Sequence, residues 1–291
     1  MDTATGRRYL EHMSDGDLSI LGGVADVLDE RLSALDLRSA PGDVERLIAH
    51  PLSWDRLFGR SSRDPFLVAT PFLVFAMLVH RAARELRGVS FIEEWVGPRK
   101  RLPVFDVGAL EEFVADPWHR LFLAELLASY THVASGSLWV EGRRGWRRQR
   151  YSELDPVRLA ALLEVVPVED RPGVYRRLGD LALFMAGVFP DRTSSWPLSL
   201  SEQGRLLRSS LLDGPGLPAQ APESLEPTGM LTLLEDLGER WYQAACASVP
   251  APSSQATSVL TSVAARFGQA RRVLNFIADH YLFSLRQRWL A

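Results

Sequence analysis

Apolar residues recur at spacings of three and four along most of the chain, which is the pattern of amphipathic helices. The segment 66–79 is apolar on all sides, so we expect its helix to lie at the centre of the core. Proline residues and capping side chains bound many of these segments. The pattern predicts helices at residues 14–37, 43–50, 64–87, 107–115, 117–133, 155–166 and 172–188, from 199 onward, at 228–248, and from 258 to the C-terminus.

One segment has the pattern of a β-hairpin instead. Two short runs, 138–141 and 146–151, flank a glycine-containing turn at 142–145. Side chains alternate between the two faces of a strand, so Arg148 and Arg150 are expected to share a face with Trp146. The stretch 90–106 contains a glycine and two prolines and is predicted to be irregular.

The distribution of proline and glycine suggests how the chain is organised. Residues 213–229 hold four prolines and three glycines and form the best candidate for a linker loop. After this loop, apolar stripes on two successive helices predict an antiparallel pair with coiled-coil-like packing. We therefore predict a mainly α fold, a multi-helix globular bundle with one inserted β-hairpin and a C-terminal antiparallel helical pair. The helical core would occupy 1–212 and the helical pair 230–291, packed together as one domain.

The composition is that of an ordinary soluble protein. The 291 residues are 46% hydrophobic and 24% charged, with a net charge of −3. The longest apolar run, 66–79, is shorter than the ~20 residues that span a bilayer, and no apolar stretch typical of a signal peptide follows the N-terminus. Arginine supplies every basic side chain except Lys100, a bias expected of a high-GC bacterial genome. We therefore expect a cytoplasmic bacterial protein without membrane insertion.

The sequence lacks the motifs of the common enzyme classes. It contains no phosphate-binding loop, dinucleotide-binding glycine motif, zinc-protease helix, hydrolase nucleophile elbow, EF-hand loop or di-iron pair. Cys246 is the only cysteine, so neither an intrachain disulfide nor a cysteine-based zinc site can form. No catalytic residue, metal site or cofactor is therefore predicted, and the question of enzymatic activity stays open.

Basic side chains are concentrated in the middle of the chain. Residues 97–150 contain nine basic and six acidic side chains, whereas the rest of the chain is net negative. Guanidinium groups match the geometry of phosphate, and an aromatic ring beside them can stack on a base. The predicted anion-binding residues are Arg143, Arg144, Trp146, Arg147, Arg148 and Arg150 of the hairpin, together with Arg99, Lys100 and Arg101. The alternative interpretation is a solvated hairpin whose arginines pair with Glu141 and Glu153.

Four further residues are candidates for a pocket in the helical core. Glu94 belongs to an acidic pair beside Trp95, and His132 lies at the end of a predicted helix. Asp180 interrupts an apolar helix, where a carboxylate is costly unless it is paired, and Arg176 one turn earlier is its expected partner. The alternative for each residue is a structural role, as part of an ion pair or as a stabilising group at a helix end.

Three functions are consistent with these patterns. The first is a binding or regulatory module whose arginine-rich hairpin engages nucleic acid or a phosphorylated or acidic partner. The second is a small-molecule enzyme or carrier with a pocket in the helical core. The third is a structural module that forms a homodimer through the C-terminal helices, since a helix over residues 258–291 would be longer than a compact core needs. We favour the first, because charge is segregated along the chain and catalytic motifs are absent.

Overall fold

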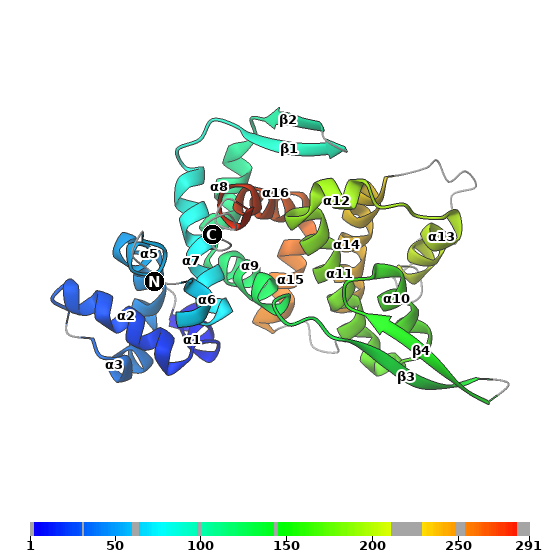
Figure 1. The fold of residues 1–291 in the computed structure, drawn as a ribbon, viewed down its shortest axis with the longest axis horizontal. Coiled ribbons are helices and arrows are strands. Elements are labelled where there is room, and N and C mark those ends of the chain that lie inside the picture. The colour runs from blue at the N-terminus through cyan, green and yellow to red at the C-terminus, as the bar shows by residue number, and fades with distance from the viewer. Residues whose placement is uncertain are drawn as a thin grey trace. The chain divides into compact units, whose positions relative to one another are not determined.

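The computed structural model describes residues 3–30, 32–59, 64–97, 100–142, 145–210, 229–247 and 254–283. Within these ranges the protein is mainly helical, which confirms the predicted fold class (Figure 1). Contacts along the chain divide it into two units. Unit 1 consists of Met1–Ile92, Phe105–Thr131 and Phe276–Ala291, and unit 2 of Glu93–Val104 and His132–Asn275. The predicted linker at 213–229 lies outside the described residues, except for Gly229.

Unit 1 is built around one buried helix. Its helices are α1 (Thr3–Glu11), α2 (Asp15–Val27), α3 (Ala34–Ser39), α4 (Pro41–Ala49), α5 (Pro51–Phe58), α6 (Pro65–Val68), α7 (Pro71–Leu86), α8 (Val107–Ala115) and α9 (Pro117–Ser129), followed near the C-terminus by the π-helical turn η3 (Ala278–Leu282). Helix α7 is buried along most of its length and packs against α9, while α1 packs against α4. The prediction that the apolar segment 66–79 lies in the core is confirmed for α7. It is wrong for the start of the segment, because the helix predicted over 64–87 is interrupted after Val68 and both Leu67 and Val68 of α6 are exposed.

The predicted helix over residues 14–37 is wrong in one respect, because the structure divides it into α2 and α3. Helix α2 ends at Val27, and Asp29 then adopts a positive φ of 60°. Ser33 is the N-cap of α3 and forms a capping box with Asp36. The Ser33 hydroxyl accepts from the backbone N–H of Asp36, and the Asp36 carboxylate accepts from the backbone N–H of Ser33. Capping chemistry inside the segment therefore outweighs the continuous apolar spacing.

Unit 2 combines two β-hairpins with a second set of helices. Its elements are β1 (Ile92–Gly97), β2 (Lys100–Val104), β3 (Ser135–Gly142), β4 (Gly145–Ser152), α10 (Pro156–Ala160), η1 (Ala161–Glu164), η2 (Val168–Asp170), α11 (Arg171–Val188), α12 (Pro190–Ser194), α13 (Leu200–Ser209), α14 (Met230–Ala247), α15 (Gln255–Ala265) and α16 (Phe267–Ile277). Helices α11 and α14 form its most extensive helix pair, and α15 packs on α14. These helices hold the buried Tyr175, Leu178, Leu237 and Trp241.

The predicted hairpin at 138–151 is confirmed as the antiparallel pair β3–β4, whose register runs from Ser135 opposite Ser152 to Gly142 opposite Gly145. The prediction that residues 90–106 are irregular is wrong, because they contain the second hairpin, β1–β2. Pro103 is compatible with this strand, since both strands of a two-stranded sheet are edges and a proline there need not donate a hydrogen bond.

The last predicted helix is not continuous. Helix α15 ends at Ala265, its C-cap Arg266 leaves helical geometry at φ −121° and ψ 32°, and α16 then begins at Phe267. The length argument for a dimer therefore no longer holds. Phe267 and Leu274, on the apolar stripe of that predicted helix, are 4% and 0% exposed and belong to the core.

Candidate functional site

The first candidate site is one face of hairpin β3–β4. The register places Trp139 opposite Arg148 and Ser137 opposite Arg150, so these four residues share one face of the hairpin. We call them the arginine face. Tyr151 lies at an alternate position opposite Gly136 and belongs to the other face, as the sequence pattern predicts.

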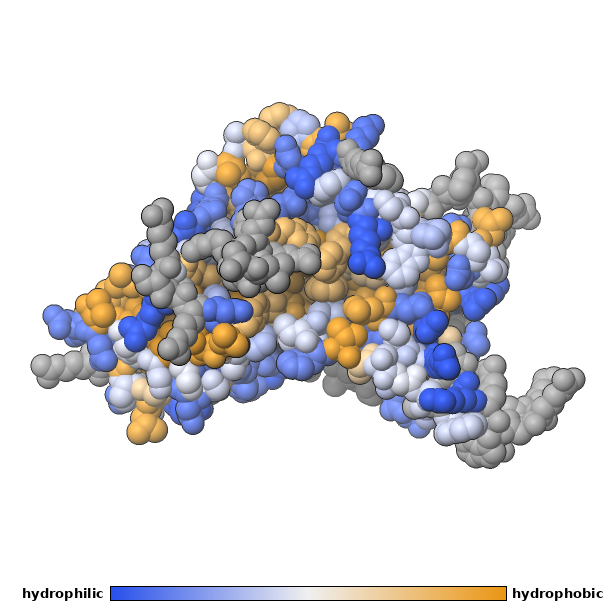
Figure 2. Space-filling model, viewed as in Figure 1, coloured by the Kyte–Doolittle hydropathy of each residue, from blue (hydrophilic) through white to orange (hydrophobic). Residues whose placement is uncertain are grey.

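The two arginines of this face are exposed and lack a carboxylate partner among the residues that the structure describes. Arg148 donates from Nε to the Ser137 hydroxyl at 2.7 Å, which orients its guanidinium without neutralising it. Glu153, the acidic residue expected to pair with the hairpin, accepts instead from Arg177 Nη2 at 3.1 Å and from the Ala134 backbone N–H at 2.9 Å. In Figure 2 a few strongly hydrophilic residues lie among paler ones in the region of β3 and β4.

Several predicted anion-binding residues fall outside this description. Arg99, Arg143 and Arg144 are not among the described residues, and neither are the side chains of Trp146 and Arg147. Their predicted role therefore stays a prediction.

Hairpin β1–β2 contains the remaining predicted cations, in a different environment. Lys100 is exposed. The guanidinium of Arg101 lies over the Trp95 ring, 4.1 Å from its centroid, and pairs with Glu93 at 3.1 Å. In this hairpin the arginine and the tryptophan thus bind each other. The two hairpins are tied to different helices, since β4 packs on α10 whereas Glu94 of β1 binds side chains of α16.

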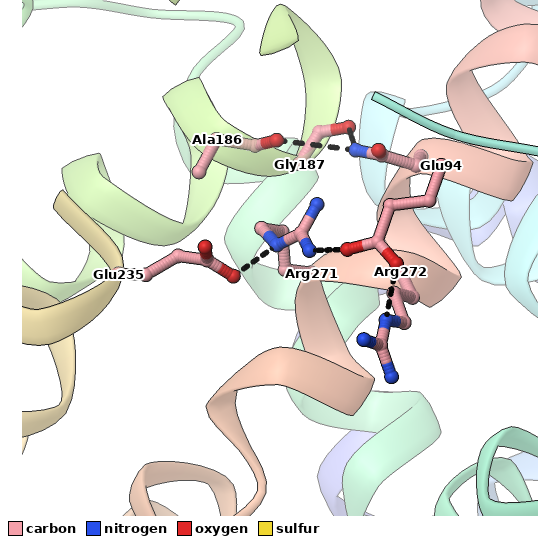
Figure 3. A network of polar contacts seen from close by, with 7 residues as sticks. Glu94, Ala186, Gly187, Glu235, Arg271 and Arg272 are labelled. Carbon is pink, nitrogen blue, oxygen red and sulfur yellow. Dashed lines mark hydrogen bonds and ion pairs between the residues drawn. The ribbon is translucent and has the colours of Figure 1, made fainter. Parts of the chain in front are cut away.

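The second candidate site is a buried network of charged side chains in unit 2 (Figure 3). Arg271 lies between two carboxylates, donating from Nη2 to Glu94 and from Nε to Glu235 of α14. Arg272 donates from Nε to the other Glu94 oxygen at 3.0 Å. Arg271 is 3% exposed and Glu94 8%. Two guanidinium groups and two carboxylates thus balance each other, as burial of charge requires.

Asn275, one turn after Arg271 on α16, extends this network toward α11. Its amide Nδ2 donates to the backbone carbonyl oxygens of Ala186, at 3.1 Å, and Gly187. Among the described residues, Arg271 Nη1 and Asn275 Oδ1 are buried without a hydrogen-bond partner. A donor and an acceptor one helical turn apart suit a small polar group such as a water molecule.

The pocket candidates from the sequence lie in different surroundings. Glu94 belongs to the buried network. Asp180 is also buried, and Oδ1 accepts from the Tyr242 hydroxyl of α14 at 2.9 Å, while Arg176 Nε lies 4.0 Å from Oδ2. Asp180 binds Tyr242, whereas the network around Glu94 includes Glu235. Tyr242 and Glu235 are two turns apart on α14, so the carboxylates of Asp180 and Glu94 make separate contacts. His132 is exposed.

Sequence reasoning did not single out Trp139, Arg271 or Arg272. For Trp139 a signal existed, because paired residues of a hairpin are equally distant from the turn, which places Trp139 opposite Arg148. For Arg271 and Arg272 no local signal exists, since their partner Glu94 lies far away in the sequence.

Unit 1 contains its own buried polar cluster. The Tyr9 hydroxyl lies 3.1 Å from His80 Nε2, and His80 lies 3.9 Å from a carboxylate oxygen of Glu45, which pairs with Arg120. Burial, and to a smaller extent the charge of Arg120, lowers the pKa of His80 to about 3. His80 is therefore neutral at pH 7. Arg120 also donates to the carbonyl oxygens of Val114 and Ala115 at the end of α8. The cluster thus joins α1, α4, α7 and α9.

The described residues contain no group of three or more His, Cys, Asp or Glu side chains that could hold a metal ion. Nor does any helix within the described ranges have the length and apolar character needed to cross a membrane. Comparisons with protein-family models, with curated proteins and with solved structures give no match to this chain.

Proposed function

We propose that this protein is a binding module that engages an anionic partner through the arginine face of hairpin β3–β4. The observation that carries this proposal is the pair of exposed arginines, Arg148 and Arg150, which lack a carboxylate partner among the described residues. Unpaired guanidinium groups on a regular strand can each form two parallel hydrogen bonds to a phosphate or carboxylate. A binding role also agrees with the absence of catalytic motifs.

The alternative interpretation, a hairpin neutralised by Glu141 and Glu153, is less favoured for Glu153. The side chain of Glu141 is not among those described, so its pairing stays a prediction. Glu153 is occupied by Arg177 and by a backbone N–H. The chain as a whole carries a net charge of −3, so general attraction to polyanions would be weak. Anion binding, if measured, would therefore come from a local surface.

Binding to heparin, a flexible polyanion without bases, tests this proposal. The variant R148A/R150A removes both arginines of the face. The matched control R205A/R208A removes two exposed arginines from α13 of the same unit, with an equal change in net charge. We expect wild type and control to bind heparin with an affinity that falls steeply with salt, and the hairpin variant to bind at least tenfold more weakly. Equal binding by all three proteins would overturn the proposal.

The other two functions stay hypotheses. For a small-molecule enzyme or carrier, the residues to test first are those around Arg271 and Asn275. For a homodimer, Phe267 and Leu274 are unsuitable test positions, because charged substitutions at these buried residues would unfold unit 2.

A further inference from the structure

Trp139 is an exposed aromatic side chain in the middle of a strand face. Its exposed fraction is 67%. Among the described residues no ring or cation stacks on its indole, and the guanidinium of Arg148 opposite is directed to the Ser137 hydroxyl. The indole and both guanidinium groups of the arginine face are therefore accessible to a partner.

In hairpin β1–β2 a tryptophan and an arginine make their contacts within the protein. There, Arg101 covers the ring of Trp95, and Glu93 neutralises Arg101. The half-buried Trp95 leaves neither an open ring nor an unpaired cation. On β3–β4 no such contact involves Trp139, Arg148 or Arg150 among the side chains that the structure describes, although the residue types are similar. This difference favours an external partner with both an aromatic and an anionic part.

The spacing of the face indicates a polymer. Arg148 and Arg150 are two residues apart on β4, so their side chains leave the strand roughly 7 Å from each other. Two cations at this separation match successive anionic groups of an extended chain. A flat indole beside them can stack on a base, and stacking requires a base whose face is free.

We infer that the partner is a single-stranded polynucleotide, with a base stacked on Trp139 and phosphates bound by Arg148 and Arg150. This inference rests on the proposed function and adds the partner's chemical class. A duplex offers its phosphates to the arginines but buries the base faces that the indole needs. Indole and guanidinium groups recognise features that DNA and RNA share, so both are expected to bind.

The test is fluorescence anisotropy with a labelled mixed-sequence oligonucleotide, as single-stranded DNA, as RNA and as the annealed duplex, beside heparin. W139A removes the stacking surface and W139F preserves an aromatic ring. F105A, at an exposed aromatic of unit 1, serves as the control. Because Trp139 is exposed, these variants should fold, which circular dichroism verifies.

We expect both single strands to bind at least tenfold more tightly than the duplex. W139A should weaken single-strand binding about tenfold while leaving heparin binding unchanged, and W139F and F105A should stay near wild type. In R148A/R150A the slope of log affinity against log salt should fall by about 1.4 for single strands.

The possible failures separate the two proposals. Equal affinity for duplex and single strand, or an unchanged W139A, would overturn this inference while heparin binding preserves the proposed function. If none of the polyanions binds, both are overturned.

Discussion

Glu94 connects the charged groups of the buried network in unit 2, because its two carboxylate oxygens accept from Arg271 and Arg272 separately. The adjacent Glu93 carries the same carboxylate, but its side chain is 57% exposed and pairs with Arg101 at the surface. Glu93 and Glu94 thus differ in burial although they are adjacent in the sequence. Replacing the carboxylate by an amide should therefore affect stability differently at the two positions.

We expect E94Q to destabilise the protein by roughly 3–5 kcal/mol, since it leaves the Arg271 guanidinium buried with a single carboxylate partner. The same change at the surface, E93Q, should cost less than about 1 kcal/mol. Urea unfolding of both variants measures the difference. A similar loss in both would mean that the network contributes no more than a surface ion pair.

His80 should make unit 1 sensitive to acid. Its pKa is about 3 in the folded protein, whereas an unfolded imidazole titrates near 6.5. Between these values the unfolded chain binds a proton that the folded chain does not, so stability falls as the pH decreases through this range. The variant H80Q removes the titrating imidazole and changes none of the groups around the ring, Tyr9, Glu45 and Arg120.

We expect wild type to lose roughly 2 kcal/mol more than H80Q between pH 7 and pH 5, in addition to the losses that both share. Urea unfolding at the two pH values measures this difference. Parallel pH dependence in the two proteins would show that His80 does not titrate on unfolding.

At the scale of secondary-structure elements, the packing of α11 against α14 and α16 depends on glycines that allow close approach. A Cβ atom added to Gly179 of α11 would lie 2.5 Å from ring atoms of the buried Tyr242, and one on Gly187 would lie 2.6 Å from Cβ of Leu274. Side chains of α14 and α16 therefore occupy the space beside these two glycines. Gly173, also on α11, has nothing within 4 Å of such an atom.

We expect G179A to destabilise unit 2 by about 1–3 kcal/mol through overpacking, and to disturb the hydrogen bond from Tyr242 to Asp180. At Gly173 alanine should be neutral or stabilising by up to about 1 kcal/mol, because it is the better helix former. Thermal unfolding followed by circular dichroism distinguishes the two. Stabilisation by both substitutions would contradict the close packing.

At the scale of the whole molecule, neither unit is one continuous stretch of sequence. Unit 1 needs Phe276–Ala291 from the end of the chain. Phe276 and Ile277 are buried there, and the Tyr281 hydroxyl donates to Glu85 of α7 at 2.6 Å. Burial around Tyr281 and its bond to Glu85 raise the pKa of the phenol, so it stays protonated as a donor.

A chain that ends after Asn275 should therefore have a destabilised unit 1, even though it contains every residue of unit 2. The loss of two large buried side chains predicts a cost of about 4 kcal/mol or more. Hydrogen exchange of the α7 amides reads out unit 1 directly, and we expect their protection to decrease strongly. Unchanged protection would show that unit 1 is complete without the C-terminal segment.

Much of the helical fold follows from local features that the sequence displays. Apolar spacing predicts α7 and the pairing of α14 with α15. Two short β-type runs on either side of a glycine-containing turn predict β3–β4. Where two local signals compete, the outcome is harder to predict. Ser33 and Asp36 cap a new helix within an apolar stripe, and Pro103 lies in a strand whose edge position tolerates it.

The sequence by itself thus determined the helical class and the central apolar helix. It also determined that Arg148 and Arg150 lie on one face of the hairpin and Tyr151 on the other, because these features depend on neighbours within a few residues. Only the tertiary structure decided that Glu94 meets Arg271 and that Asp180 meets Tyr242. It also decided that Glu153 binds Arg177 and not the arginine face. These pairs join residues far apart in the sequence. Their formation depends on the path of the chain and on which charges burial forces together.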